Sequence, residues 1–291
     1  TRYWRDWSSD VCSSDLAYGF IDIAILGGNI LAIAAFVFGN LLKKRTNYFL
    51  LSLSVADLMI GAISVPMFMV SFVQHYQGIL EEKYRFIYTY VDVFSGFASI
   101  FALAVIAMER LYSVTLPSFH RITKRYVYYL SIAMVWFLAA VVAILRIFTV
   151  EKIVPMKRFF DALVCSCAIS IAVICIAYGG VWFKVKHRNH EMTRKMIEKD
   201  KKLAITLAIV TAVFIVTWLP LHLINIVYFH CAKNCDIRAP GLPQVVYFAK
   251  FLQYSNSFVN PIIYTYKIPE FRQTIKKIVG INYRLLSSKS K

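Results

Sequence analysis

Acidic residues and cysteines are both scarce in this chain. Its 291 residues hold 16 Asp and Glu against 33 Lys and Arg, which gives a formal net charge of +17. The six cysteines are scattered, which excludes a fold built on a dense framework of disulfides. The hydrolase motifs H-E-x-x-H and G-x-S-x-G are missing as well, so we expect a protein that is not an enzyme.

Polar residues are too few to cover a soluble globule. Hydrophobic residues make up 59% of the chain, and its mean hydropathy is +0.59. Apolar runs long enough to cross about 30 Å of hydrocarbon recur along the chain. We place these runs at residues 17–39, 47–74, 85–115, 126–147, 159–183, 203–230 and 243–265. The sequence therefore predicts an all-α membrane protein, a seven-transmembrane helix bundle.

Basic residues avoid these runs and gather in alternate connections. The connections after the first, third and fifth spans carry Lys43, Lys44, Arg45, Arg121, Lys124, Arg125 and a dense run over 184–202, while the other loops carry Glu81, Glu82, Glu151 and Asp236. Positive charge marks cytoplasmic loops, so we expect a multi-pass plasma-membrane protein with an extracellular amino terminus. Because the basic residues form no continuous groove, nucleic acid is not an expected partner.

The two ends of the chain differ from the predicted seven-span domain, residues 17–266. Residues 1–16, TRYWRDWSSDVCSSDL, are polar and contain the near-repeat SSD-VC-SSD. They lack the apolar core of a signal peptide and look like translated cloning sequence, so we treat them as a non-native leader. In the tail, residues 267–291, Phe271, Ile275 and Ile278 recur at helical spacing beside basic residues. This pattern predicts a short amphipathic helix along the inner membrane surface.

Several polar residues fall inside the predicted spans. They are Asn29, Asp57, Asp92, Glu109, Arg110, Lys250, Asn256 and Asn260. A charge within a membrane is costly and commonly faces a cavity or a partner, which makes such residues functional candidates. The alternative for any one of them is a hydrogen bond between neighbouring helices.

A series of motifs, one in each of several spans, resembles the rhodopsin-like (class A) G-protein-coupled receptors. In order along the chain they are Gly28-Asn29, LSLSVADL with Asp57, Glu109-Arg110-Leu111, Trp136, Thr217-Trp218-Leu219-Pro220 and Asn260-Pro261-Ile262-Ile263-Tyr264. The resemblance covers nearly the whole chain from Gly28 onward. It implies a receptor in the lipid bilayer that binds a small extracellular agonist and activates a heterotrimeric G protein. The tail helix would then correspond to helix 8.

The resemblance implies a buried sodium site and a cytoplasmic switch. Its sodium ligands would be Asp57, Ser99, Asn256, Ser257 and Asn260, oxygen-bearing side chains of the kind that hard cations prefer. Allosteric Na⁺ is thus the one cofactor-like ion expected. The switch residues would be Glu109, Arg110, Asp200, Pro261 and Tyr264. Agonist binding would favour a state in which span 6 swings outward and frees Arg110.

Two receptor families compete for the ligand. The segment around Trp218, Leu221, His222 and Asn225, the loop at Glu151 and the Cys231–Cys235 pair resemble adenosine receptors, which implies a disulfide and an adenine site. Tyr247 and Lys250 are further candidate ligand-binding residues, although Lys250 replaces an apolar residue of the adenosine-receptor pattern. Against that resemblance, Val150 stands where an aromatic side chain would stack on the purine.

The other resemblance is to aminergic receptors. Asp92 matches their amine-binding carboxylate and Tyr254 the tyrosine that supports it. A carboxylate among aromatic rings binds an ammonium by ion pairing and cation–π contact. The alternative is that Lys250 pairs with Asp92 internally.

Other classes of membrane protein stay open at this stage. A secondary transporter would be expected to show internal repeats and broken helices. The sequence has no such repeat. A non-signalling membrane protein is the remaining alternative. Arg85 stands where the receptor family has the cysteine that links span 3 to the second extracellular loop, so that loop has no expected disulfide.

Overall fold

The computed structural model describes a helical protein. It covers the backbone of residues 2–79, 81–187, 194–230 and 242–289, and side chains within 16–74, 77–79, 81–187, 209, 212–230, 244–278 and 280. The helices are α1 (Arg2–Phe38), α2 (Asn47–Met59), α3 (Val65–Gln77), α4 (Glu82–Thr115), α5 (Pro117–Ile122), α6 (Arg125–Val150), α7 (Met156–Lys186), α8 (Arg194–His230), α9 (Leu242–Lys267) and α10 (Pro269–Lys289). These covered segments contain no strand.

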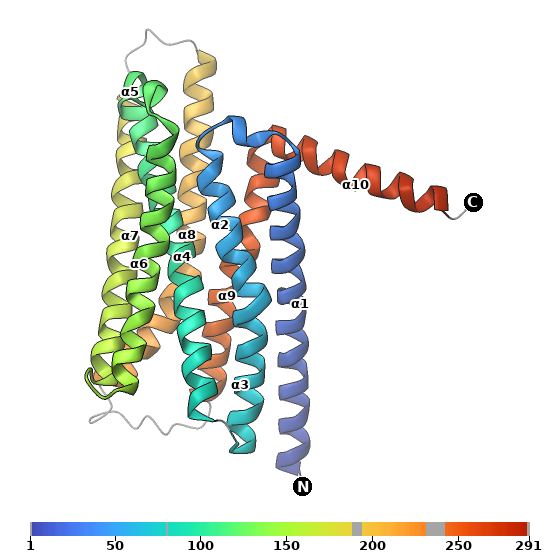
Figure 1. Cartoon of the computed structure of the whole chain (residues 1–291), viewed down its shortest axis with the longest axis vertical. Coiled ribbons are helices and arrows are strands. Elements are labelled where there is room, and N and C mark those ends of the chain that lie inside the picture. The colour runs from blue at the N-terminus through green and yellow to red at the C-terminus, as the bar shows by residue number, and fades with distance from the viewer. Residues whose placement is uncertain (1, 80, 188–193, 231–241, 290–291) are drawn as a thin grey trace.

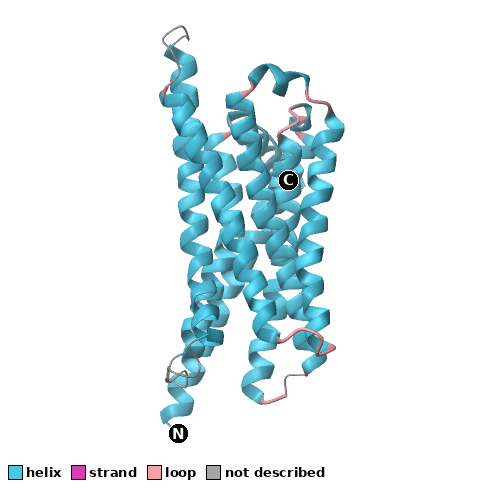
Figure 2. Ribbon diagram, turned by 90° about the vertical axis from the view of Figure 1, so that its left-hand side faces the viewer, coloured by secondary structure: helices cyan, strands magenta, loops and turns pink. Residues whose placement is uncertain are grey.

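The long helices run side by side as a bundle, and α10 leaves one end of it at a steep angle (Figure 1). We call this end, which also carries α5 and the short helical turn η1 (Leu41–Lys43), the α10 end, and the other the opposite end. Helix α4 packs against α2, α6 and α7, and α9 packs against α8 and α1. A second view, turned by 90°, shows the same bundle of nearly parallel helices (Figure 2).

Six helices in the described residues are long and apolar enough to cross a membrane. Their spans are Leu16–Phe38, Asn47–Gln74, Glu82–Thr115, Arg125–Val150, Met156–Lys186 and Ala212–His230. The seventh predicted span is α9, whose Lys250, Gln253, Asn256 and Asn260 lower its hydropathy. Three of these side chains are buried inside the bundle, and Gln253 is partly buried. The seven-helix bundle predicted from the sequence is therefore confirmed, with a polar inner face on α9.

The second span contains a π-helical turn, η2 (Ile60–Ser64), between α2 and α3. Pro66 lies two residues after it, and a proline within a helix removes a backbone donor and clashes with the carbonyl four residues earlier. A wider turn relieves that clash and rotates the helix beyond it. The face that α3 turns toward its neighbours therefore differs from the face obtained by continuing the periodicity of α2.

Helix α10 confirms the amphipathic helix predicted in the tail. Phe271 is fully buried, with its ring centroid 5.3 Å from Phe36 and 5.8 Å from Tyr264. Lys44 also pairs with Glu270 at 2.5 Å, although both side chains are largely exposed, so apolar packing contributes more to docking. At the other terminus, the predicted boundary at residue 16 lies within the continuous helix α1.

Gly39, at the end of α1, offers a test of the contact between α1 and α10. A Cβ atom there would meet the Ala35 carbonyl oxygen and Thr274 Cγ2 within 2.5 Å. We expect Gly39→Ala to destabilise the purified protein by about 1–3 kcal/mol, because backbone must shift to admit the methyl group. Thermal unfolding in detergent would measure the loss. Gly27→Ala is the matched control, since nothing lies within 4 Å of its Cβ; equal losses for both variants would contradict the packing argument.

Candidate functional site

A buried ion pair joins α4 and α9 in the half of the bundle toward the opposite end. Lys250 Nζ donates to Asp92 Oδ2 at 2.6 Å, and Tyr254 Oη donates to Asp92 Oδ1 at 2.8 Å. The side chains of Lys250 and Asp92 are only 8% and 13% exposed. Both carboxylate oxygens of Asp92 are therefore occupied by the protein itself. The internal pair that the sequence left as an alternative is present.

Further polar contacts extend this pair into a cluster. Gln253 Oε1 accepts a second hydrogen bond from Lys250 at 2.8 Å, and the Lys250 ammonium lies 4.7 Å from the centroid of the Tyr254 ring. Tyr88 Oη lies 3.3 Å from Tyr254 Oη. The sequence did not single out Tyr88, although it precedes Asp92 by one helical turn. The cluster compensates a buried ammonium on several sides, as a charge away from water requires.

An aromatic stack on α8 lies deeper in the bundle. The ring centroids of Phe214 and Trp218 are 5.5 Å apart, and those of Trp218 and His222 are 5.8 Å apart. Gly96 of α4 makes room for the stack, because a Cβ there would lie 3.3 Å from Trp218. Trp218 Nε1 and both ring nitrogens of His222 are buried with no hydrogen-bond partner in the described part of the chain. Such unpaired polar atoms mark a place where a polar ligand would be stabilised.

A cavity of about 260 Å³ lies between α7 and α8. Its lining includes Asn225 and the stacked rings of Phe160 and Phe229, whose centroids are 4.3 Å apart. Asp161 and His230 also line it and pair at 3.2 Å, with each side chain about two-fifths exposed. Stacked rings beside an amide suit a planar group that carries hydrogen-bonding edges.

The other predicted ligand-site residues lie in different surroundings. Glu151 is exposed in the short connection between α6 and α7, and Leu221 is partly buried on α8. Tyr247 is buried, 4.5 Å from Tyr18 and 4.3 Å from Phe72 between ring centroids. Phe68 joins this aromatic cluster to Tyr254 at 5.9 Å. Tyr247 therefore packs beside the Asp92 cluster, whereas Glu151 does not join it.

The predicted sodium-site residues surround a fully buried carboxylate, Asp57 of α2. Ser99 Oγ donates to its Oδ1 at 2.8 Å and Asn260 Nδ2 donates to its Oδ2 at 2.7 Å. Asn256 and Ser257 are buried near these residues in sequence, and Asn29 Nδ2 donates to the Ser257 carbonyl at 3.1 Å. Asn29 Oδ1 and Ser54 Oγ are buried without a partner in the described residues.

The chemistry of this donor set fits a small monovalent cation. Asp57 makes no ion pair with a basic side chain in the described residues, so its charge is met by neutral donors. A buried carboxylate of this kind is costly unless a cation compensates it. Carboxylate, hydroxyl and amide oxygens are the ligands that hard cations prefer.

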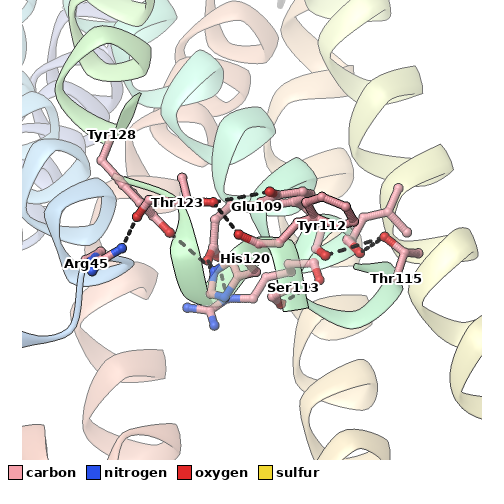
Figure 3. Close-up of polar contacts among 11 residues, drawn as sticks. Arg45, Glu109, Tyr112, Ser113, Thr115, His120, Thr123 and Tyr128 are labelled. Carbon is pink, nitrogen blue, oxygen red and sulfur yellow. Dashed lines mark hydrogen bonds and ion pairs between the residues drawn. The ribbon is translucent and has the colours of Figure 1, made fainter. Parts of the chain in front are cut away.

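The predicted switch residues lie toward the α10 end. Arg110 Nε is 3.4 Å from Glu109 Oε2, and His120 Nε2 is 2.7 Å from Glu109 Oε1 (Figure 3). Tyr264 of α9 is buried between Phe36 and Phe271, and its hydroxyl has no hydrogen-bond partner in the described residues. The contact of His120 with Glu109 could not be predicted from the sequence, because it depends on how α5 docks.

Helix α9 approaches α1 closely around Pro261. A Cβ on Gly28 would lie 3.1 Å from Pro261 Cγ, so glycine permits this approach. Pro220 and Pro261 each lie inside a long helix, where the missing backbone donor provides a bending point. Three predicted residues lie outside the description: the side chain of Asp200, and both Cys231 and Cys235.

Comparisons with known proteins point to one family. The profile described as 7 transmembrane receptor (rhodopsin family) matches residues 28–264. Adenosine receptor A2a of Homo sapiens is 28% identical over 88% of this chain and 69% of its own length. Adenosine receptor A2b of Gallus gallus is 28% identical over 89% of this chain and 86% of its own length. Adenosine receptor A3 of Canis lupus familiaris is 25% identical over 87% of this chain and 86% of its own length.

The family match spans the helices that carry the Asp57 and Asp92 clusters and the Arg110 switch. Together with the seven-helix bundle and its amphipathic α10, it identifies the chain as a multi-pass membrane protein of the rhodopsin family of seven-transmembrane receptors.

Proposed function

We propose that this receptor couples an extracellular small molecule to a heterotrimeric G protein across the plasma membrane. The basic connections containing Lys43–Arg45 and Arg121–Arg125 lie at the α10 end, which supports a cytoplasmic location for that end. The opposite end, with the amino terminus, then faces outward. The Asp92 cluster and the α7–α8 cavity lie on the ligand side, and Arg110 lies on the G-protein side.

The proposed ligand is a neutral, adenosine-like nucleoside. The observation that carries this proposal is the buried Asp92–Lys250 pair, because it leaves Asp92 without a free oxygen for an ammonium ligand. The similar receptors named above also bear adenosine in their names. Phe160 and Phe229 supply an aromatic surface beside Asn225. They could stack on a purine in place of the aromatic residue that Val150 replaces.

Activation is proposed to be a shift between two arrangements of α8. A ligand that satisfies the unpaired nitrogens of His222 and Trp218 would favour the arrangement in which α8 bends at Pro220 and its α10-end half moves outward. Arg110 would then leave Glu109 and enter the opened cleft. Only a difference in ligand affinity between the two states can drive this change.

A biogenic amine is the second candidate ligand. Asp92 and the ring of Tyr254 already bind one ammonium, that of Lys250, in a sheltered site. An amine would have to displace Lys250 from Asp92, which leaves a buried ammonium unpaired. This cost favours the nucleoside.

Arg110→Ala tests the proposed coupling. We expect this variant to lower ligand-stimulated nucleotide exchange on purified G protein by about tenfold or more, a coupling free energy in the usual allosteric range. Ligand binding should survive, because Arg110 lies at the other end of the bundle. Lys186→Ala removes the same charge from an exposed position at the end of α7 and should exchange normally. Normal exchange in Arg110→Ala would rule out the switch.

A ligand panel applied to two variants separates nucleoside from amine. Asn225→Ala should weaken adenosine binding by about 10- to 100-fold, because the amide hydrogen bonds are lost. Lys250→Met should free Asp92 and create a response to phenethylamine, and Lys250→Met with Asp92→Asn should abolish that response. Radioligand displacement measures both effects. The amine would be favoured if the unmodified protein bound phenethylamine and Asn225→Ala left that binding intact.

Asp57→Asn tests the proposed sodium site. Because Asn keeps the shape of Asp57 but loses its charge, we expect agonist affinity to become insensitive to NaCl replaced by choline chloride. In the unmodified protein the same replacement should change affinity by about fivefold, at the low end of allosteric coupling. Glu81→Gln, at an exposed position, should keep the effect. Sodium sensitivity that persists in Asp57→Asn would place the ion elsewhere.

A further inference from the structure

Three polar contacts attach the short helix α5, and Thr123 directly after it, to the α10 end of the bundle. Arg45, from the connection between α1 and α2, donates to the Thr123 carbonyl, and Tyr112 Oη of α4 lies 3.2 Å from Thr123 Oγ1. His120, on α5 itself, contacts Glu109 of α4 (Figure 3). These contacts hold an imidazole beside the predicted switch.

Glu109 divides its two oxygens between two basic side chains. Oε1 faces His120 Nε2 at 2.7 Å, and Oε2 faces Arg110 Nε at 3.4 Å. The side chain of Glu109 is 7% exposed, and those of His120 and Arg110 are 22% and 23% exposed. Water and salt therefore screen this group less than they screen a surface pair. A change of charge on one basic partner must therefore alter the electrostatic attraction between Glu109 and the other.

The contact between His120 and Glu109 survives a change in the charge of the imidazole. With a proton on Nε2, both the neutral ring and the imidazolium donate to Oε1, and the additional proton of the imidazolium enters at Nδ1. Tyr128 Oη lies 3.3 Å from the same Nε2 and its ring belongs to α6. Protonation thus alters the charge beside Glu109 while the partners stay in place.

We propose that His120 is a positioning residue for the Glu109–Arg110 switch and makes G-protein activation sensitive to cytoplasmic pH. The inference rests on the proposed coupling to a G protein. When the imidazole is neutral, the full negative charge of Glu109 acts on Arg110 and favours the inactive arrangement. When the imidazole is charged, it neutralises Glu109, and Arg110 leaves more readily. Acidification therefore favours exchange.

Histidine suits this role because its charge normally changes within the range of cytoplasmic pH. The titratable groups that face His120 are Glu109 and Tyr112 from α4 and Tyr128 from α6. Arg110 acts through Glu109, and Arg45 holds the end of the same connection at Thr123. A phenol is ordinarily neutral and a guanidinium ordinarily charged throughout this range, so an imidazole is the kind of group in this set whose ordinary chemistry responds to a mild acidification.

Nucleotide exchange measured as a function of pH tests the proposal. The unmodified receptor in lipid nanodiscs with purified G protein, without ligand and with adenosine, should exchange about two- to fivefold faster at pH 6.0 than at pH 7.5, the ratio expected for a partly sheltered ion pair. At each pH, rates are expressed relative to the exchange rate of the G protein without receptor, which corrects for the pH dependence of the G protein. In His120→Gln the exchange rate should be low and independent of pH. In His120→Arg it should be high and independent of pH.

His187→Gln is the matched control for histidine content. His187 is exposed at the end of α7, and its contacts within the described residues are with its own helix, through the Phe183 carbonyl and ring. This variant should keep the pH response of the unmodified receptor. A response that persists in His120→Gln, or that disappears in His187→Gln, would overturn the role of His120.

A second measurement separates failure of this inference from failure of the coupling. The ¹⁵N resonance of His120 Nε2, assigned by its loss in His120→Gln, should change in Glu109→Gln and stay unchanged in Glu151→Gln. If the resonance changes in Glu109→Gln but no nucleotide exchange occurs at any pH, the His120–Glu109 contact is supported and the proposed coupling to a G protein is wrong. If exchange occurs but the resonance is the same in Glu109→Gln, the coupling is supported and the proposed role of His120 is wrong.

Discussion

Polar side chains inside an apolar bundle must find partners in one another, and this constraint fixes how the helices of this receptor meet. Asp57 of α2 accepts hydrogen bonds from Ser99 of α4 and Asn260 of α9, and Asp92 of α4 accepts from Lys250 of α9. Hydrocarbon offers no alternative partner, so an unpaired group would cost several kcal/mol. A small rotation of α4 or α9 would break these contacts together. The polar interior thus holds three helices in one register.

The same constraint explains which parts of the fold the sequence predicted. Run length and charge depend on local composition, so each predicted span and the amphipathic tail helix falls on a helix of the structure, although α1 and α8 begin well before their predicted spans, at Arg2 and Arg194. Helix α9 was also found from the length of its apolar run, although its polar residues, including Asn256 and Asn260, lower its mean hydropathy. Of the predicted sodium-site residues, Ser99 and Asn260 do contact Asp57, since all three lie deep in neighbouring spans; the ion itself stays a prediction.

Contacts that depend on helix rotation or loop docking could not be predicted in this way. Tyr247 was predicted to contact the ligand, and the sequence did not indicate that its ring also packs against Tyr18 and Phe72. Glu151 stays exposed because the connection between α6 and α7 is short. His120 reaches Glu109 only because α5 folds back on α4, and no periodicity in the sequence records that return.

The distribution of polar contacts also indicates which helix is free to move. Helix α4 is tied to α9 by Asp92 and to α5 by Glu109, so both charged clusters share it. Among the described side chains of α8, the polar contact with another helix is the His230–Asp161 pair, close to the opposite end. The rest of α8 meets its neighbours through apolar contacts such as Trp218 with Phe97. Apolar contacts are not directional, so among the described side chains a tilt of α8 at Pro220 breaks fewer interhelical hydrogen bonds than a tilt of α4 would. That asymmetry is why the proposed mechanism assigns the motion to α8 and leaves α4 as the fixed support of both sites.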